Sequence, residues 1–119
     1  SGYRKNVGKY GEGLAADYYR QRGYNFVIGN FQKKYGEIDL IVEKDNEIVF
    51  VEVKTRASKL FGYGEEAVTK TKKIKIQKTI DAFLMAHADY EKYFPRFDIL
   101  VVELFGEEPQ FVHFENVEM

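Results

Sequence analysis

Two short apolar segments separated by an Asp-Asn pair constrain the fold of this 119-residue chain more than any other feature. Residues 37–43 and 48–54 are rich in β-branched and apolar side chains, and Asp45-Asn46 between them is typical of a tight turn. With a symmetric turn the numbers of paired residues sum to 91, so Asp39 lies opposite Glu52. A three-residue loop would instead put the two acids on opposite faces. The sequence therefore predicts an antiparallel hairpin, and its symmetric form brings two carboxylates together.

Helical and strand periodicities outside this hairpin predict the rest of the fold. Apolar residues at helical spacing indicate helices over residues 7–23 and 68–88. Further strands are expected over residues 24–30, 97–104 and 110–114, which gives the order α-β-β-β-α-β-β. This order favours an α/β fold with helices packed against a mixed central sheet. The inward positions expected in the second helix are Ile74, Ile76, Ile80, Phe83 and Leu84.

Length and hydropathy limit the classes of protein to which the chain can belong. At this length we expect one domain, residues 1–119, with a core of its own. No apolar run approaches the roughly 18 residues of a membrane span, and the N-terminus lacks a signal-peptide pattern. We therefore expect a cytoplasmic protein.

The predicted pair of acids suggests a metal site. Like charges opposed across a sheet repel, so the pair needs a cation between them or a proton on one acid. The chain has no cysteine, which favours oxygen ligands and a hard cation such as Mg²⁺ or Mn²⁺. Beside a phosphodiester such an ion stabilises the transition state, and Lys54, on the same face as Glu52, could orient a water or neutralise phosphate charge. The alternative is a structural network of ion pairs among Glu37, Asp39, Glu52 and Lys54.

A basic segment follows the predicted hairpin. From Lys54 to Lys78 the chain has eight basic and two acidic residues, a net charge of +6 in a chain whose total is −1. Such a segment can attract a polyanion to one part of an otherwise acidic molecule. The alternative is a solvated, lysine-rich helix face.

The residues around both acids resemble a known nuclease pattern. Gly36-Glu37-Ile38-Asp39-Leu40-Ile41 followed by Phe50-Val51-Glu52-Val53-Lys54-Thr55-Arg56 resembles the PD-(D/E)xK nuclease superfamily, with Ile38 in place of its proline. More narrowly, the chain is similar to the YraN-like family and to archaeal Holliday junction resolvases. The likeness extends to Gly11-Glu12, Asn30, Phe61-Gly62, Lys72 and Arg96-Phe97-Asp98.

The resemblance implies a restriction-endonuclease-like αβββαβ core and assigns roles to single residues. Asp39 and Glu52 would bind Mg²⁺ or Mn²⁺ with a contribution from Glu12, and Lys54 would join these three as a catalytic residue. Products would carry a 5′-phosphate and a 3′-hydroxyl. The nucleic-acid contacts expected from the basic residues are Arg56, Lys72 and Lys73.

The positions of several other polar residues indicate their roles. Glu12 falls beside the apolar arc of the first helix, so it could reach the sheet edge or be an exposed helix acid. Arg96 and Asp98 are expected to pair structurally at the entry of a strand. The isolated His87 and His113 are more often ordinary surface or core histidines than metal ligands.

Three functions are consistent with these observations. The first is a metal-dependent endonuclease that hydrolyses DNA, at branched or structured sites and as a homodimer. The second is a nucleic-acid-binding module that keeps the nuclease fold without turnover. The third is a structural protein in which the acids and lysines form only ion pairs.

Overall fold

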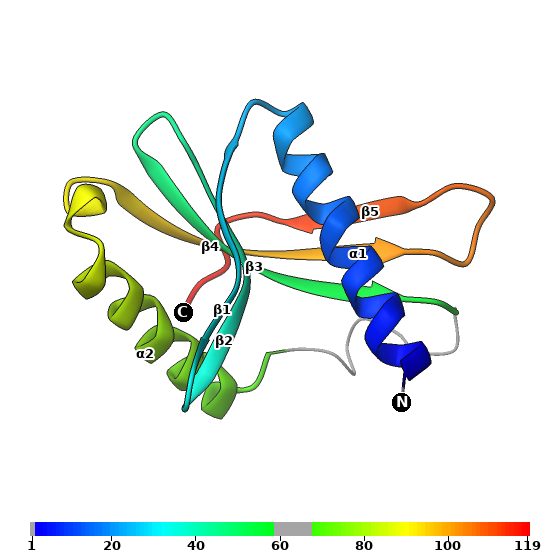
Figure 1. Cartoon of the computed structure of the whole chain (residues 1–119), viewed down its shortest axis with the longest axis horizontal. Helices are drawn as coiled ribbons and strands as arrows, with labels where there is room; N and C mark the ends of the chain where they lie inside the picture. The colour runs from blue at the N-terminus through cyan, green and yellow to red at the C-terminus, as the bar shows by residue number, and fades with distance from the viewer. Residues whose placement is uncertain (1, 59–67) are drawn as a thin grey trace.

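The computed structural model describes residues 2–58 and 68–119 and has the element order predicted from the sequence (Figure 1). A short 3-10 helix, η2, is added after the second helix. The Phe61-Gly62 pair, to which the family resemblance extends, lies outside the described residues. The elements are α1 (Gly2–Gln21), β1 (Asn25–Lys33), β2 (Gly36–Lys44), β3 (Glu47–Arg56), α2 (Lys70–Ala86), η2 (Ala88–Tyr90), β4 (Phe94–Glu103) and β5 (Gln110–Phe114).

The five strands form one mixed sheet in the order β1-β2-β3-β4-β5. β3 and β4 are parallel and the other neighbours are antiparallel. Asp45 and Asn46 have φ angles of 49° and 66°, which are typical of a two-residue type I′ turn. The β2–β3 ladder runs from Lys44 opposite Glu47 to Leu40 opposite Val51, which confirms the register inferred from a symmetric turn.

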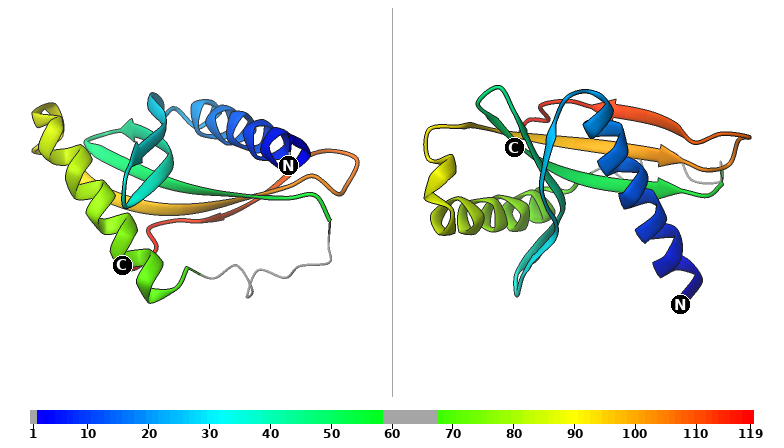
Figure 2. Two further views of the ribbon diagram at one scale, coloured as in Figure 1. Left: turned by 60° about the horizontal axis from the view of Figure 1, so that its bottom comes forward. Right: turned by 45° about the horizontal axis from the view of Figure 1, so that its top comes forward.

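The helices cover opposite faces of the sheet (Figure 2). Ala15, Ala16 and Tyr19 of α1 pack against one face, where Val49 and Val51 of β3 lie. The other face packs on α2, through Ile76, Ile80 and Phe83 among others. The central strands are therefore buried on both sides, and a charged side chain there needs a partner or a function.

The helix ends follow local sequence signals. α1 begins five residues before the predicted start and ends at a Schellman motif, in which Gly23 has a φ of 90° and the Tyr24 amide donates to the Tyr19 carbonyl at 3.1 Å. Thr69 caps α2 by accepting a hydrogen bond from the Lys72 amide. Neither helix, over the part of the chain described, is long and apolar enough to cross a membrane.

One predicted inward position proves to be exposed. Ile74 is 52% exposed, so that prediction is wrong. Tyr10, which belongs to the helical apolar pattern of residues 7–23, is also 57% exposed. Ile74 lies about 200° around the helix from the buried Ile76, because successive residues turn by about 100°. Ile76, Ile80 and the other two predicted positions of α2 do face the sheet.

Strict strand alternation predicts Ile38 on the same face as Leu40 and Val42, and this prediction is wrong. Leu40 and Val42 pack on the α1 side, whereas Ile38 packs on the α2 side. The change occurs where pairing with β3 has ended, so that this part of β2 pairs only with β1, and a two-stranded ribbon twists more strongly than a wide sheet. Asn30 of β1, with a φ of 54°, lies in the same part of the ribbon. β2 and β3 therefore diverge beyond Leu40 and Val51.

Candidate metal and nucleic-acid site

The point at which β2 and β3 diverge carries the two predicted acids. We call it the β2–β3 fork, formed by Asp39 on β2 with Glu52 and Val53 on β3. Asp39 directly precedes Leu40, the first residue of β2 that pairs with β3, and its Oδ2 accepts a hydrogen bond of 2.8 Å from the Val53 amide. A side chain thus takes the place that a backbone carbonyl occupies in the ladder. This bond fixes the Asp39 carboxyl in the opening between the strands.

Asp39 and Glu52 are in direct contact across the fork. Burial raises the pKa of the Asp39 carboxyl to about 8, and the negative charge of Glu52 adds to the shift. The Val53 amide opposes the shift, whereas the Glu12 charge and a hydrogen bond with Glu52 increase it. A hydrogen bond between two carboxyl groups requires that one of them carries a proton. The predicted approach of these two acids is therefore present, and their contact favours a proton on one of them.

Glu12 approaches from α1 and acts on the fork electrostatically. Burial raises the pKa of its carboxyl, a hydrogen bond with the Asn30 side chain opposes the shift, and the charges of Glu37 and Glu52 add to it. The preceding residue, Gly11, explains how the helix comes so near. A Cβ at Gly11 would lie 1.9 Å from the Thr55 Oγ1, so α1 rests directly on β3 there.

Two lysines neutralise Glu52 from different elements. The Lys72 ammonium of α2 lies 2.5 Å from Glu52 Oε2, and that of Lys54 lies 3.7 Å from the same oxygen. Burial lowers the pKa of Lys72, but the hydrogen bond and the negative charge of Glu52 outweigh this effect and raise it. The fork therefore brings three acids, Asp39, Glu52 and Glu12, within electrostatic reach of one another. Two ammonium groups lie beside Glu52.

A pocket of about 450 Å³ opens beside the fork, between β2 and the first turns of α2. Asp39 and Glu52 lie on its wall, so both acids are accessible to a small ligand. Its lining, among the described residues, is Gly36, Glu37, Asp39, Glu52, Thr69, Thr71, Lys72, Lys75 and Ile76.

Asp39 and Glu52 are the residues that could hold a hard cation at the fork. Their oxygens meet at one point, and the pocket leaves room for the water ligands that Mg²⁺ retains. Over the described part of the chain, no group of three acidic or histidine side chains is gathered closely enough to hold a metal ion. Glu12 therefore acts on Asp39 through its charge in this arrangement.

Comparison with known proteins identifies the family. The family model described as "Uncharacterised protein family UPF0102" matches residues 11–102. The chain belongs to the UPF0102 family. A UPF0102 protein of Clostridium botulinum (strain Loch Maree) is 44% identical over 100 residues, which cover 84% of this chain and 81% of the relative. One of Caldicellulosiruptor bescii is 46% identical over 101 residues, covering 85% and 83%.

The segment matched to UPF0102 contains every residue of the candidate site, but the structure gathers only some of the predicted ones around the pocket. Lys72 lies at the fork, whereas Arg56 and Lys73 do not line the pocket. Arg56 instead donates a hydrogen bond to the Thr55 carbonyl. Lys75, which is not among the predicted contacts, does line the pocket; helical spacing indicates it, because it follows Lys72 by three residues.

Glu37 also differs from the simple hairpin expectation. The symmetric register places it opposite Lys54, but the β2–β3 ladder ends before that pair. Glu37 is exposed and accepts a hydrogen bond of 3.2 Å from Gln32 on β1. The divergence of the strands therefore moves Glu37 to the rim of the pocket.

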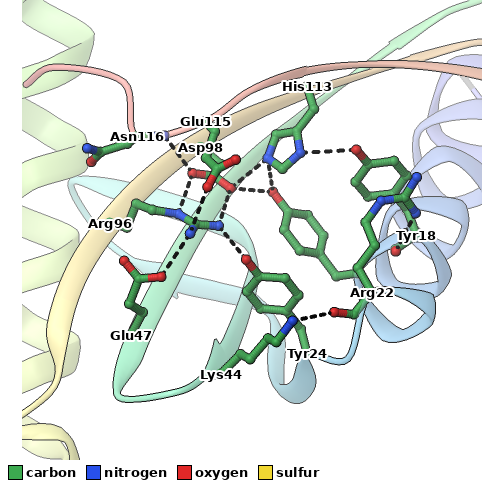
Figure 3. Close-up of polar contacts among 11 residues, drawn as sticks. Tyr18, Arg22, Tyr24, Lys44, Glu47, Arg96, Asp98, His113, Glu115 and Asn116 are labelled. Carbon is green, nitrogen blue, oxygen red and sulfur yellow. Dashed lines mark hydrogen bonds and ion pairs between the residues drawn. The ribbon is translucent and has the colours of Figure 1, made fainter.

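A second buried polar network in this UPF0102 fold is structural (Figure 3). Arg96 donates to both carboxylate oxygens of Asp98 at 3.0 Å, which confirms the predicted pairing. His113 and the Tyr19 hydroxyl each lie 2.7 Å from Asp98 Oδ2. Burial alone would raise the pKa of Asp98, but its bonds with His113, Arg96, the Asn116 amide and Tyr19 lower it to about 2. A fully satisfied carboxylate of this kind ties α1 to β4 and β5.

Proposed function

We propose that this chain is a Mg²⁺- or Mn²⁺-dependent endonuclease of the PD-(D/E)xK type that hydrolyses phosphodiester bonds in branched or otherwise structured DNA. The observation that carries the proposal is the contact between the Asp39 and Glu52 carboxyls at the wall of a pocket that Lys72 also lines. Buried like charges in contact are costly unless a ligand uses them, and perturbed pKa values of this kind are frequent at functional sites.

The fork fits a hard divalent cation. Asp39 and Glu52 offer only oxygen atoms, and burial together with the Glu52 charge raises the pKa of Asp39, so a cation bound by both carboxylates would take the place of a proton. A cation bound by these two carboxylates would polarise the phosphodiester and make hydroxide available near neutral pH. Glu12 would add negative charge nearby, which strengthens the attraction for a cation.

The chain's own residues would divide the remaining work. The Val53 amide holds Asp39 in place, so that its carboxylate does not have to be ordered when substrate binds. The Lys54 ammonium, close to Glu52, would stabilise charge that develops on the phosphate. In hydrolysis a water oxygen bonds to phosphorus, the bond from phosphorus to the 3′ oxygen breaks, and that oxygen takes up a proton. The products would be a 5′-phosphate and a 3′-hydroxyl.

The proposal is tested by cleavage of single-stranded, duplex, flap and four-way-junction DNA with Mg²⁺ or Mn²⁺. Asp39→Asn, Glu52→Gln and Lys54→Met should each lower the cleavage rate by at least about 100-fold while circular dichroism shows an intact fold. Lys92→Gln, an exposed residue away from the pocket, is the control. Cleavage that survives in all three site variants comes from another source and would overturn the proposal. The mass of the protein on four-way junctions tests the further expectation of a homodimer.

A second candidate function follows from Lys72. Its ammonium already neutralises Glu52, and Asp39 can keep a proton near neutral pH, so the protein can balance its own acids. Such a site would suit a DNA-binding module without turnover. Salt-dependent DNA binding together with no cleavage under any metal condition would favour this function over the first.

A further inference from the structure

The end of the β1–β2 hairpin extends past the fork and carries two exposed lysines. The ladder closes at Lys33 opposite Gly36, with Lys34 and Tyr35 in the turn. Both lysines are exposed. Lys34 precedes Asp39 by five positions, which at the rise of a strand is roughly 16 Å. Positive charge therefore lies far from Asp39 along the hairpin, just past the end of the pocket at Gly36.

This hairpin end is held against α2. A Cβ at Gly36 would lie 2.9 Å from the Thr79 Oγ1 and 3.4 Å from the Lys75 carbonyl, so the hairpin rests on the helix backbone. Thr79 in turn donates a hydrogen bond of 2.8 Å to that carbonyl. Gly36 and Lys75 both line the pocket. The lysines of the hairpin end thus continue a basic surface that begins at Lys75. The packing of Gly36 on α2 holds this part of the hairpin in place.

α1 carries a similar basic surface on the other side of the fork. Lys5 and Lys9 are exposed and precede Glu12 by seven and three residues, a spacing that puts all three on one helix face. Lys9 is near enough for its charge to act on the Glu12 carboxyl. Figure 1 and the right-hand view of Figure 2 show the start of α1 and the hairpin end projecting from the same side of the molecule.

We infer that the hairpin end, residues 33–35, is a second contact for the sugar-phosphate backbone of DNA, with Lys33 and Lys34 binding phosphates several nucleotides from the one at the fork. This inference rests on the proposed function. At about 3.4 Å of rise per nucleotide of one strand, the distance along β2 corresponds to about five phosphates. Lys5 and Lys9 of α1 bind phosphates on the opposite side. The DNA therefore crosses the acidic fork. The hairpin end and the start of α1 hold it on either side of the phosphate at the fork.

The experiment is a titration of fluorescein-labelled duplex about three helical turns long, followed by anisotropy in EDTA at several salt concentrations. Lys34→Gln should weaken binding several-fold and reduce the slope of log K against log salt by about 1. Lys33→Gln should act in the same direction. The matched control, Lys92→Gln, removes the same charge from an exposed position beyond the C-terminal end of α2, and should leave the slope unchanged.

A trimmed duplex adds a test of position. When the duplex is shortened until it no longer reaches the hairpin end, Lys34→Gln should bind as the wild type does. Unchanged affinity and slope in both Lys34→Gln and Lys33→Gln on the long duplex would overturn the inference, even if cleavage at the fork is observed. A loss of DNA affinity in Lys34→Gln and Lys33→Gln no larger than in Lys92→Gln would overturn it too, because such a loss would reflect only the change in net charge. A specific loss at Lys34 without any metal-dependent cleavage would support the hairpin contact and reject the nuclease.

Discussion

Asp98 is fully buried and Asp39 half-buried in the same sheet, and the surroundings of their carboxyls differ in nearly every respect. Asp98 is bound by Arg96, His113, Tyr19 and a backbone amide, and its pKa is lowered to about 2. Asp39 has one amide donor and two acids near it, and its pKa is raised to about 8, chiefly by burial. The first arrangement stabilises the fold without further ligands. The second makes ionisation of Asp39 unfavourable, and perturbed pKa values of this kind are frequent at binding sites.

The largest expected effect concerns the satisfied carboxyl. Asp98→Asn leaves the buried Arg96 without its main counter-charge and should lower the free energy of unfolding by about 3–5 kcal/mol. Near pH 4, Asp39→Asn should change it by less than about 1 kcal/mol, because an amide copies the shape of a protonated acid. Near neutral pH the same variant should raise it, because asparagine needs no proton at this buried position. Urea unfolding of both variants measures the difference. Equal losses would mean that the two carboxyls are not distinct in kind.

A divalent cation should stabilise the protein through Asp39 and Glu52, and not through Asp98. Mg²⁺ or Mn²⁺ at about 100 times its dissociation constant should add about 2.7 kcal/mol to the free energy of unfolding, seen as a rise in Tm. EDTA should reverse the rise. Glu52→Gln removes one of the proposed ligands and should abolish it, whereas Asp98→Asn should retain it. A rise of the same size in Glu52→Gln would place the cation elsewhere.

The approach of α1 to the fork can be tested through its glycines. Gly11→Ala puts a methyl group against Thr55 and should cost about 1–3 kcal/mol, with Glu12 displaced from the fork. Gly8→Ala is the matched control in the same helix, since a Cβ there meets nothing within 4 Å. It should stabilise by about 0.5–1 kcal/mol through helix propensity. Thermal unfolding distinguishes the two, and a neutral Gly11→Ala would contradict the close packing.

The smallest expected effect is the change in the free energy of unfolding per pH unit, which has opposite signs for the two acids. Folded Asp39 keeps its proton up to about pH 8, above its ordinary value of 3.8, so its contribution to stability is lost as pH rises between these values. For Asp98, with a folded value of about 2, stability is lost as pH falls below about 4. Each slope is at most about 1.4 kcal/mol per pH unit. The free energy of unfolding should be measured from pH 3 to 9. Asp39→Asn should abolish its decline toward high pH, and Asp98→Asn its decline toward low pH.

Local sequence signals were sufficient for much of this fold and for the central pair of the site. The Asp45-Asn46 turn fixed the register, and the register brought Asp39 beside Glu52. Arg96 and Asp98 were also recognised as a structural pair. These features depend on residues close in sequence or on strict strand alternation, which a periodicity argument captures.

The features that were missed depend on the backbone leaving its regular path or on contacts between distant elements. Ile38 changes face because β2 continues as a twisted two-stranded ribbon, and alternation carries no sign of that change. Lys75 reaches the pocket because Gly36 lets the hairpin rest on α2, a contact across 39 positions of sequence. The role of His113 in the second network likewise requires β5 to lie beside β4.

The hydrogen bond from the Val53 amide to Asp39 gives the protein a spectroscopic reporter of its own. The proton on that nitrogen points at the carboxyl whose charge is in question, so its chemical shift follows the ionisation of Asp39. Binding of a cation would change the same resonance without any added label. One backbone signal in a two-dimensional spectrum can therefore follow both proton and metal at the fork in a single titration.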